Sequence, residues 1–186
     1  MFTRLAIPDV ILVQPKRHGD HRGFFEESFV ASRYAEGGIE GPFVQDNHSL
    51  SGGVGTLRGL HFQTEPSPQG KLVRCTRGRI LDVAVDIRQG SPTYGQHVSE
   101  ELSAENGRQL WVPAGFAHGF VTLEPNTEVQ YKVTSYYDPE ADKGLAWDDP
   151  ALGIDWGLGG KEPVLSGKDT QHPVLADLPT YFTYKG

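Results

Sequence analysis

The sequence is poor in cysteine, in long apolar runs and in clustered basic residues. Cys75 is the only cysteine in 186 residues, which excludes an intrachain disulfide and any zinc site built from several cysteines. The longest apolar stretches, such as residues 10–13 and 119–123, are far shorter than the roughly 20 residues needed to cross a bilayer. The first residues, MFTRL, show neither an extended apolar core nor a small-residue cleavage site. We therefore expect a cytoplasmic protein with no membrane partner.

Positive charge is also scarce. Lys and Arg total 17 against 24 Asp and Glu, so the formal net charge is −7. General nucleic-acid affinity depends on neutralising phosphates, and this balance therefore argues against nucleic acid as a partner. It leaves room for a small anionic ligand held by a few local Arg and Lys side chains. Hydrophobic residues make up 37% of the chain, which is enough for a folded core and excludes wholesale disorder.

Glycine and proline punctuate the chain in a way that predicts an all-β fold. The 23 Gly and 13 Pro occur between short apolar runs and are not pooled in one linker, which is typical of a sandwich or barrel. Strands are predicted over residues 72–76 and 80–87, joined by a tight turn at Gly78. The second strand should place two sets of side chains on opposite faces. These sets are Leu81, Val83, Val85 and Ile87 on one face, and Asp82, Ala84 and Asp86 on the other.

Two further predictions concern a strand and a helix. Alternation over residues 129–133 predicts a strand that turns Tyr131 inward. One short helix is predicted over residues 29–36, with Ser28 as its N-cap and a glycine pair as its stop. No internal repeat or composition shift marks a second domain, so residues 1–186 are expected to form a single domain.

The segment WVPAGFAHGF at residues 111–120 resembles the second motif of the cupin superfamily. It places a Pro-x-Gly turn three residues before His118 at the start of a strand. In metal-binding cupins this histidine is a ligand, together with an HxH pair and a Glu. The matching region here offers His61 followed by Phe and Gln, so we expect no metal. The same segment fits equally well a plain hairpin with a hydrogen-bonded core histidine.

Longer blocks carry a more specific resemblance. In order they are GDHRGFFEES at 19–28, FVQDNHS at 43–49, LRGLHFQ at 57–63, QGKLVR at 69–74, RQLWVPAGFAHGF at 108–120, YK at 131–132 with YY at 136–137, and LSGKD at 165–169. With these blocks the chain, from about residue 7 to 173, resembles the dTDP-4-dehydrorhamnose 3,5-epimerase family. The resemblance implies an all-β double-stranded β-helix, or cupin jelly roll, with few short helices. It also implies dTDP-4-dehydro-6-deoxy-D-glucose as the substrate, and no cofactor.

The resemblance assigns four residues to the chemistry. The family's reaction removes protons from carbons 3 and 5 beside a ketone at carbon 4, so it needs a base on one face, an acid on the other and a donor at the enolate oxygen. His61 matches the base, Asp169 the carboxylate that orients it, and Tyr131 the opposed acid. Lys71 matches a cation near the sugar. Taken alone, each residue fits a structural role as well, such as a hydrogen-bonded core side chain or a loop acid.

The resemblance also implies a substrate-binding shell that includes part of a second subunit. In such enzymes N-terminal strands pair across a homodimer and complete the neighbouring site. The matching positions are Arg22, Glu27, Gln45, Asp46, Asn47, Arg58, His118, Tyr137, Asp142 and Lys168. Asp142 stands where the family commonly has a longer Glu. The tail at residues 180–186 has no counterpart, and we assign it no role.

The sequence therefore predicts a metal-free epimerase that inverts carbons 3 and 5 to give dTDP-4-dehydro-L-rhamnose. Three alternatives stay open. The same histidine, aspartate and tyrosine would serve an enzyme that inverts carbon 3 only in a related deoxysugar pathway. A nucleotide-sugar-binding cupin without turnover would need neither a base nor an opposed acid. A metal-dependent cupin would need the HxH pair that is missing here.

Overall fold

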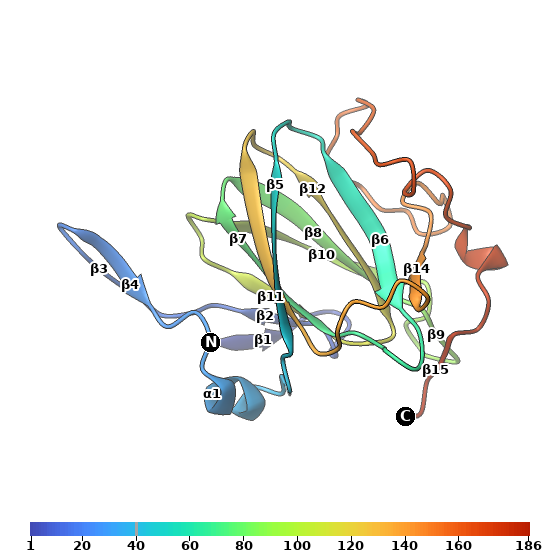
Figure 1. Cartoon of the computed structure of the whole chain (residues 1–186), viewed down its shortest axis with the longest axis horizontal. Helices are drawn as coiled ribbons and strands as arrows, with labels where there is room; N and C mark the ends of the chain where they lie inside the picture. Colours follow the sequence, from blue (N-terminus) through green and yellow to red (C-terminus); the bar gives the residue numbers. More distant parts are fainter. Residues whose placement is uncertain (40) are drawn as a thin grey trace.

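The computed structural model describes residues 1–39 and 41–186 and consists mainly of two antiparallel β-sheets that face each other (Figure 1). The larger sheet contains six strands. In spatial order they are β1 (Phe2–Arg4), β2 (Ile11–Val13), β11 (Gln109–Val112), β7 (Lys71–Arg77), β13 (Thr127–Val133) and β5 (Gln45–Ser51). The smaller sheet contains five, in the order β10 (His97–Ser103), β8 (Arg79–Asp86), β12 (Phe116–Thr122), β6 (Leu57–Gln63) and β14 (Asp142–Gly144).

From β5 to β8 and again from β10 to β14, successive strands alternate between the two sheets. Strands β7 and β8 flank Gly78, whose φ of 74° suits glycine, yet β7 pairs with β11 and β13 while β8 pairs with β10 and β12. The Pro-x-Gly turn likewise carries the chain from β11 in the larger sheet to β12 in the smaller one, so it is not a hairpin. This alternation is the double-stranded β-helix that the sequence predicts, and the all-β cupin fold is confirmed.

The core has three parts: two layers lie on either side of the smaller sheet, and a third cluster packs Tyr34 of the helical segment against Leu72 and Trp111 of the larger sheet. The inner layer fills the space between the sheets, and its buried members include Val73, Ile80, Leu110, Phe116 and Phe120. The outer layer lies between the smaller sheet and the C-terminal part of the chain, which runs along that side of the barrel (Figure 1). The predicted face of Val83, Val85 and Ile87 belongs to this outer layer, and Asp82, Ala84 and Asp86 are also fully buried on the opposite face.

The only helix of more than three residues in the described chain, α1 (Ala31–Glu36), is shorter than predicted. Its N-cap is Val30 and no side chain caps it, so the assignment of Ser28 as N-cap was wrong. The Ser28 carbonyl instead accepts hydrogen bonds from the side chains of Tyr34 and Gln109. The helix ends at Gly37, as predicted. None of the described helices is both long and apolar enough to cross a membrane.

The tail at residues 180–186 has a structural place that the sequence did not indicate. After the 3₁₀ turn η1 (Leu175–Asp177), strand β15 (Phe182–Thr183) pairs in parallel with β9 (Arg88–Gln89). Tyr181 and Phe182 pack against Phe62, and the Arg88 guanidinium lies over the Tyr184 ring. The tail therefore closes the outer apolar layer of the barrel.

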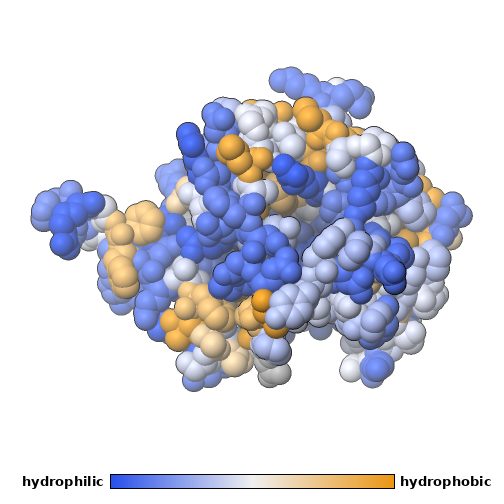
Figure 2. All heavy atoms as spheres, viewed as in Figure 1, coloured by the Kyte–Doolittle hydropathy of each residue, from blue (hydrophilic) through white to orange (hydrophobic). Residues whose placement is uncertain are grey.

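A hairpin of β3 (Arg17–Asp20) and β4 (Gly23–Glu26) projects away from the barrel (Figure 1). It carries Phe24 and Phe25, which are 60% and 68% exposed. The space-filling view shows the arm standing clear of the body, with a hydrophilic tip and apolar atoms behind it (Figure 2). Two neighbouring exposed aromatic side chains on a projecting arm are unusual for a surface that meets only water.

Candidate active site

Three adjoining cavities open at one end of the space between the sheets, and Tyr131 lines all of them. The largest has a volume of about 450 Å³ and is lined by Arg58, His61, Lys71, His118 and Asp169 among others. A second, of about 400 Å³, shares His61 and Lys71 with the first. It is also lined by Gln45, Asn47, Tyr137, Asp142 and Lys168. The third, of about 250 Å³, includes Asp46, Asn47 and the ring of Phe29 in its lining.

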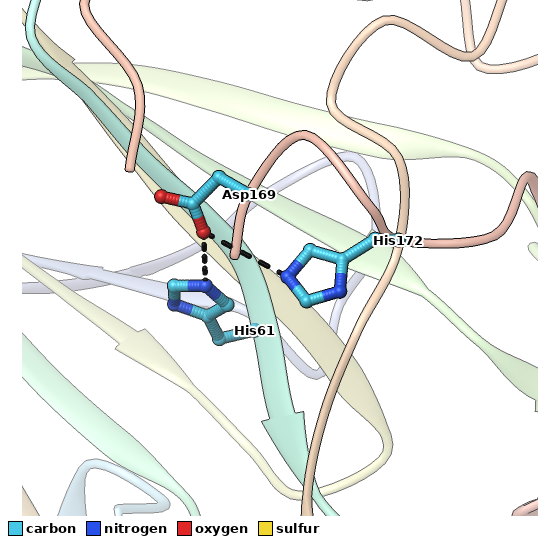
Figure 3. Close-up of side chains that lie close together, drawn as sticks. All are labelled: His61, Asp169 and His172. Atoms are coloured by element: carbon cyan, nitrogen blue, oxygen red, sulfur yellow. Dashed lines mark hydrogen bonds and ion pairs between the residues drawn. The ribbon is translucent and has the colours of Figure 1, made fainter. Parts of the chain in front are cut away.

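A histidine and an aspartate form a close pair in the largest cavity. His61 comes from β6, and Asp169 from a turn 108 residues later, with Nε2 of His61 2.5 Å from Oδ1 of Asp169 (Figure 3). The Ser166 hydroxyl donates to the other carboxylate oxygen at 2.8 Å. Burial alone would raise the pKa of Asp169, but the hydrogen bonds from His61 and Ser166 and the charge of His61 hold it below its usual value. Asp169 is therefore an ionised carboxylate that orients the imidazole.

Tyr131 faces the same cavity from the opposite sheet. His61 lies on β6 of the smaller sheet and Tyr131 on β13 of the larger one, so the two side chains approach the cavity from opposite walls. The inward orientation of Tyr131 follows the predicted alternation, since Val129 on the same face belongs to the inner core. Burial raises the pKa of Tyr131, which keeps its hydroxyl protonated well above neutral pH. The arrangement places a proton donor across from a proton acceptor.

Lys71 is a buried cation that lines the same cavity as the His61–Asp169 pair. Its Nζ donates to the backbone oxygen of His61 at 3.3 Å, so the side chain is folded into the cavity and does not extend to water. Burial lowers the pKa of Lys71 to about 8, although the nearby carboxylates of Asp142 and Asp82 oppose this shift. The ammonium group is therefore present at neutral pH and lost in mildly alkaline solution.

The remaining predicted binding residues fall into two groups. All twelve predicted residues that follow Glu27 in the chain line one or more of the three cavities. His118 bonds to the buried Asp82 at 2.8 Å, and the Arg58 guanidinium donates to Ser51 at 3.2 Å. Asp142 forms an ion pair with Lys168. Both residues of this ion pair line the second cavity.

Arg22 and Glu27 line none of these three cavities. Arg22 sits at the exposed end of the projecting hairpin and pairs with Asp20 at 2.5 Å. Glu27 pairs with Arg33 at 2.9 Å on the surface. Within one chain the structure therefore separates these two predicted residues from the other twelve.

The structure adds residues that sequence reasoning missed. Among them are the cavity-lining side chains Ser49, Arg74, Phe120 and Ser166, and also His172, which lies beside Asp169. Ser166 stands inside the quoted LSGKD block, so its three-residue spacing from Asp169 was a usable signal. His172 lies in an irregular segment where neither helical nor strand periodicity points to it.

His172 also bears on the question of metal binding. Ligand atoms of His61, Asp169 and His172 lie within 4.8 Å of one another, so a three-residue group exists where the sequence indicated none. Two ligands of one tetrahedral zinc ion lie about 3.3 Å apart, given bonds of about 2.0–2.1 Å. The 2.5 Å between Nε2 of His61 and Oδ1 of Asp169 is shorter and corresponds to a direct hydrogen bond. The geometry fits a proton-transfer pair better than a metal centre.

A double-stranded β-helix with a His–Asp pair facing a tyrosine across one cavity defines a cupin protein with a proton-transfer site. Sequence comparison narrows this class. The profile of the family described as dTDP-4-dehydrorhamnose 3,5-epimerase matches residues 4–177. The dTDP-4-dehydrorhamnose 3,5-epimerase of Sinorhizobium fredii is 56% identical over 183 residues, which cover 98% of this chain and 93% of that protein. The chain belongs to the dTDP-4-dehydrorhamnose 3,5-epimerase family.

Solved structures agree with this assignment. The dTDP-6-deoxy-D-glucose-3,5-epimerase of Legionella pneumophila, in complex with dTDP-4-keto-L-rhamnose, has a TM-score of 0.95 and 46% identity, covering 100% of this chain and 99% of that one. A 3'-monoepimerase from Streptomyces bikiniensis, in complex with dTDP-quinovose, has a TM-score of 0.90 and 35% identity, covering 97% and 92%. The backbone fold is thus shared with epimerases of both reaction types, while the sequence identity is higher to the 3,5-epimerase than to the 3'-monoepimerase.

Proposed function

We propose that this protein is a dTDP-4-dehydrorhamnose 3,5-epimerase that converts dTDP-4-dehydro-6-deoxy-D-glucose to dTDP-4-dehydro-L-rhamnose. The observation that carries the proposal is the placement of the His61–Asp169 pair and Tyr131 on opposite walls of one cavity. A binding protein without turnover would not need an oriented base and an opposed acid. The family and the double-epimerase names of the relatives support the same conclusion.

The proposed mechanism uses the acidity of protons beside a ketone. Neutral His61 takes the proton from carbon 3 or carbon 5, and the electron pair of that C–H bond moves to oxygen 4 to form an enolate. Asp169 stabilises the imidazolium that results. The Lys71 ammonium stabilises the negative oxygen, and the Tyr131 hydroxyl returns a proton to carbon from the opposite face. Inversion follows because the proton leaves toward one sheet and arrives from the other.

We also propose that the outer two cavities hold the nucleotide part of the substrate. A diphosphate needs cations; Lys168 lines the second cavity, and Arg58 lines the largest cavity itself, beside the sugar site. Asp46 and Asn47 line the neighbouring cavity with the Phe29 ring, a combination of hydrogen-bonding groups and an aromatic surface that suits a nucleobase. This division assigns the sugar to the depth of the barrel and the nucleotide to its mouth.

The direct test is proton NMR of dTDP-4-dehydro-6-deoxy-D-glucose with catalytic amounts of the protein in deuterated water. The proposal expects loss of the signals at both carbons 3 and 5 and an L-rhamno product after trapping with a 4-ketoreductase. Exchange and inversion at carbon 3 alone would assign the protein to the monoepimerases. Tight dTDP binding without exchange at either carbon would leave only the binding role.

We further propose that the protein works as a homodimer whose projecting hairpins each reach the other subunit's site. The hairpin holds Arg22 away from the cavities of its own chain, and its two exposed phenylalanines suit a protein contact. Residues 1–186 then act as one catalytic domain per subunit. Cys75 is the single cysteine and its thiol is free and buried, which is consistent with a protein that acts in a reducing compartment such as the cytoplasm.

The dimer proposal predicts the effect of Phe25→Ser. Phe25 is 68% exposed on the arm, so its loss should leave the barrel folded but remove apolar contact area between subunits. Light scattering should show a fall from about twice the chain mass of 20.4 kDa toward one chain. Val54→Ser, at an exposed loop residue, is the matched control and should stay dimeric. A wild-type chain that is already monomeric at micromolar concentration would contradict the proposal.

The lowered pKa of Lys71 predicts that kcat/KM decreases at alkaline pH, which gives the pH profile a basic limb. Its pKa of about 8 means that the ammonium group is lost as the pH rises through 8, so kcat/KM should fall there. Tyr131 does not produce this limb, because burial raises its pKa. In Lys71→Arg the guanidinium keeps its charge, and the limb near pH 8 should disappear even if the rate is lower. A wild-type profile that stays flat to pH 9.5 would refute the role of Lys71.

A chelator should leave the activity unchanged. His61 and Asp169 hydrogen-bond directly to each other, and each proposed step uses only side chains of the chain, so no metal ion is needed. Incubation with excess chelator followed by the NMR exchange assay tests this expectation. A loss of exchange that added metal restores would overturn the metal-free mechanism.

A further inference from the structure

His172 is a nine-tenths buried histidine beside the His61–Asp169 pair. Its Nε2 lies 3.7 Å from Oδ1 of Asp169, and within the described chain this nitrogen has no hydrogen-bond partner. Its ring stands edge-on to the His61 ring, with centroids 5.5 Å apart and an angle of 84° (Figure 3). A buried polar atom without a partner costs free energy, so an apolar side chain here would be more stable. Its presence points to a function.

The fold makes room for this imidazole at a glycine. Gly144 on β14 is the cross-strand partner of His61 on β6. A Cβ atom at Gly144 would collide with the His172 ring, Nε2 included. Two hydrogen bonds fix the backbone that follows Gly144. The Leu145 N–H donates to the Leu60 carbonyl, and the Ala146 N–H donates to the Pro173 carbonyl. The His172 ring therefore packs in a defined position against β14, the strand that pairs with the His61 strand β6.

We propose that His172 is a positioning residue that holds Asp169 in line with His61 and weakens the hold of the carboxylate on the protonated form of His61. The inference rests on the proposed function. Oδ2 of Asp169 is fixed by Ser166, whereas Oδ1 faces both imidazoles. Nε2 of His172 is 3.7 Å from Oδ1, too far for a hydrogen bond, so its polar edge acts on this oxygen only electrostatically and draws it slightly away from His61, which then gives up a proton more readily. An enzyme that inverts two carbons takes up a proton on its base twice for each substrate molecule, so the base must release that proton twice.

The charges around His172 favour its neutral form. Burial lowers the pKa of His172, and the positive charges of His61 on β6 and Lys168 on its own loop act in the same direction. The carboxylates of Asp169, on the same loop, and Asp142, on β14, oppose the shift. A neutral His172 does not repel the imidazolium that forms on His61 during the reaction.

The test compares two substitutions that differ in the polar edge. His172→Gln keeps an N–H group near the same place, and His172→Leu fills a similar volume without one. We expect His172→Leu to lower kcat roughly 10-fold with KM nearly unchanged, because the base is misplaced while the binding groups are not. The acid limb of its pH profile should move to higher pH by about half a unit, since Asp169 then acts on His61 alone. His172→Gln should restore most of kcat.

A second variant reaches the same site without changing His172. In Gly144→Ala the new methyl group displaces the His172 ring, so kcat should fall with the same shift of the acid limb. In the Gly144→Ala, His172→Ala double variant the space is free, and the combined loss should not exceed that of His172→Ala alone. Additive losses would overturn the proposal.

Three other results would also overturn it. These are an unchanged kcat and pH profile in His172→Leu, equal losses in the Leu and Gln variants, and an unaltered NMR titration of the His61 ring in ligand-free His172→Leu. The ring titration does not depend on turnover. A wild-type protein without epimerase activity would therefore refute the proposed function, while the titration would still decide whether His172 acts on His61.

Discussion

Replacing His61 with Ala should abolish hydrogen exchange at both carbon 3 and carbon 5. One imidazole serves both positions, because both protons become acidic through the same ketone, and loss of a general base costs on the order of 10²–10⁴-fold. Binding of dTDP should persist, since the groups proposed for the nucleotide lie in the adjoining cavities. The measurement is deuterium incorporation at each carbon by NMR, together with calorimetric titration of dTDP.

His97→Ala is the matched control for this experiment. His97 lies on β10 at the edge of the smaller sheet and pairs with Val85, away from the cavities described above. It should retain normal exchange at both carbons. Near-normal turnover in His61→Ala would refute the assignment of the base. Loss at one carbon only would mean that a second base serves the other.

Tyr131→Phe should separate proton removal from inversion. The ring and its packing against the inner core are kept, but the proton donor on the wall opposite His61 is removed. His61 can still take a proton and return deuterium to the same face, so exchange should continue at a reduced rate. Net inversion should fall roughly 10²-fold or more, the usual contribution of a positioned acid. NMR reports exchange, and trapping with a 4-ketoreductase reports the configuration of the product.

Tyr181→Phe provides the control for loss of a phenol group. Tyr181 packs against Phe62 in the outer layer, so its hydroxyl has no part in the proposed reaction. This variant should exchange and invert as the wild type does. If Tyr131→Phe also inverted at the wild-type rate, another group would have to be the acid.

The strands and their turns could be predicted from the sequence because a period of two residues is a local signal. The pattern over residues 129–133 indicated the direction of Tyr131, and Gly78 marked a turn that needs a positive φ. Which strands pair is not local. Strands β7 and β8 adjoin in the chain but belong to different sheets, and the apolar face of β8 packs against the C-terminal segment. A strand buried on both faces conceals which side faces the inner core.

The site could be predicted only as far as its motifs extended. His61 and Asp169 are 108 residues apart, and their predicted pairing came from matched blocks; their 2.5 Å contact is now visible. Ser28 was assigned as a cap because serine often caps helices, but its own backbone oxygen is used instead. His172 gave no signal because it lies in an irregular segment, and only the folded chain shows that Gly144, distant in sequence, leaves space for its ring.

The location of the proposed base and the proposed acid on different sheets makes the width of the barrel a stereochemical quantity. Because His61 and Tyr131 lie on different sheets, the gap between them depends on the inner-layer side chains that separate the sheets, such as Ile80 and Leu110. A change in the volume of these side chains would alter how far a planar enolate must shift to meet its second proton. In the proposed mechanism, the handedness of the sugar product therefore depends on the hydrophobic packing that spaces the two sheets.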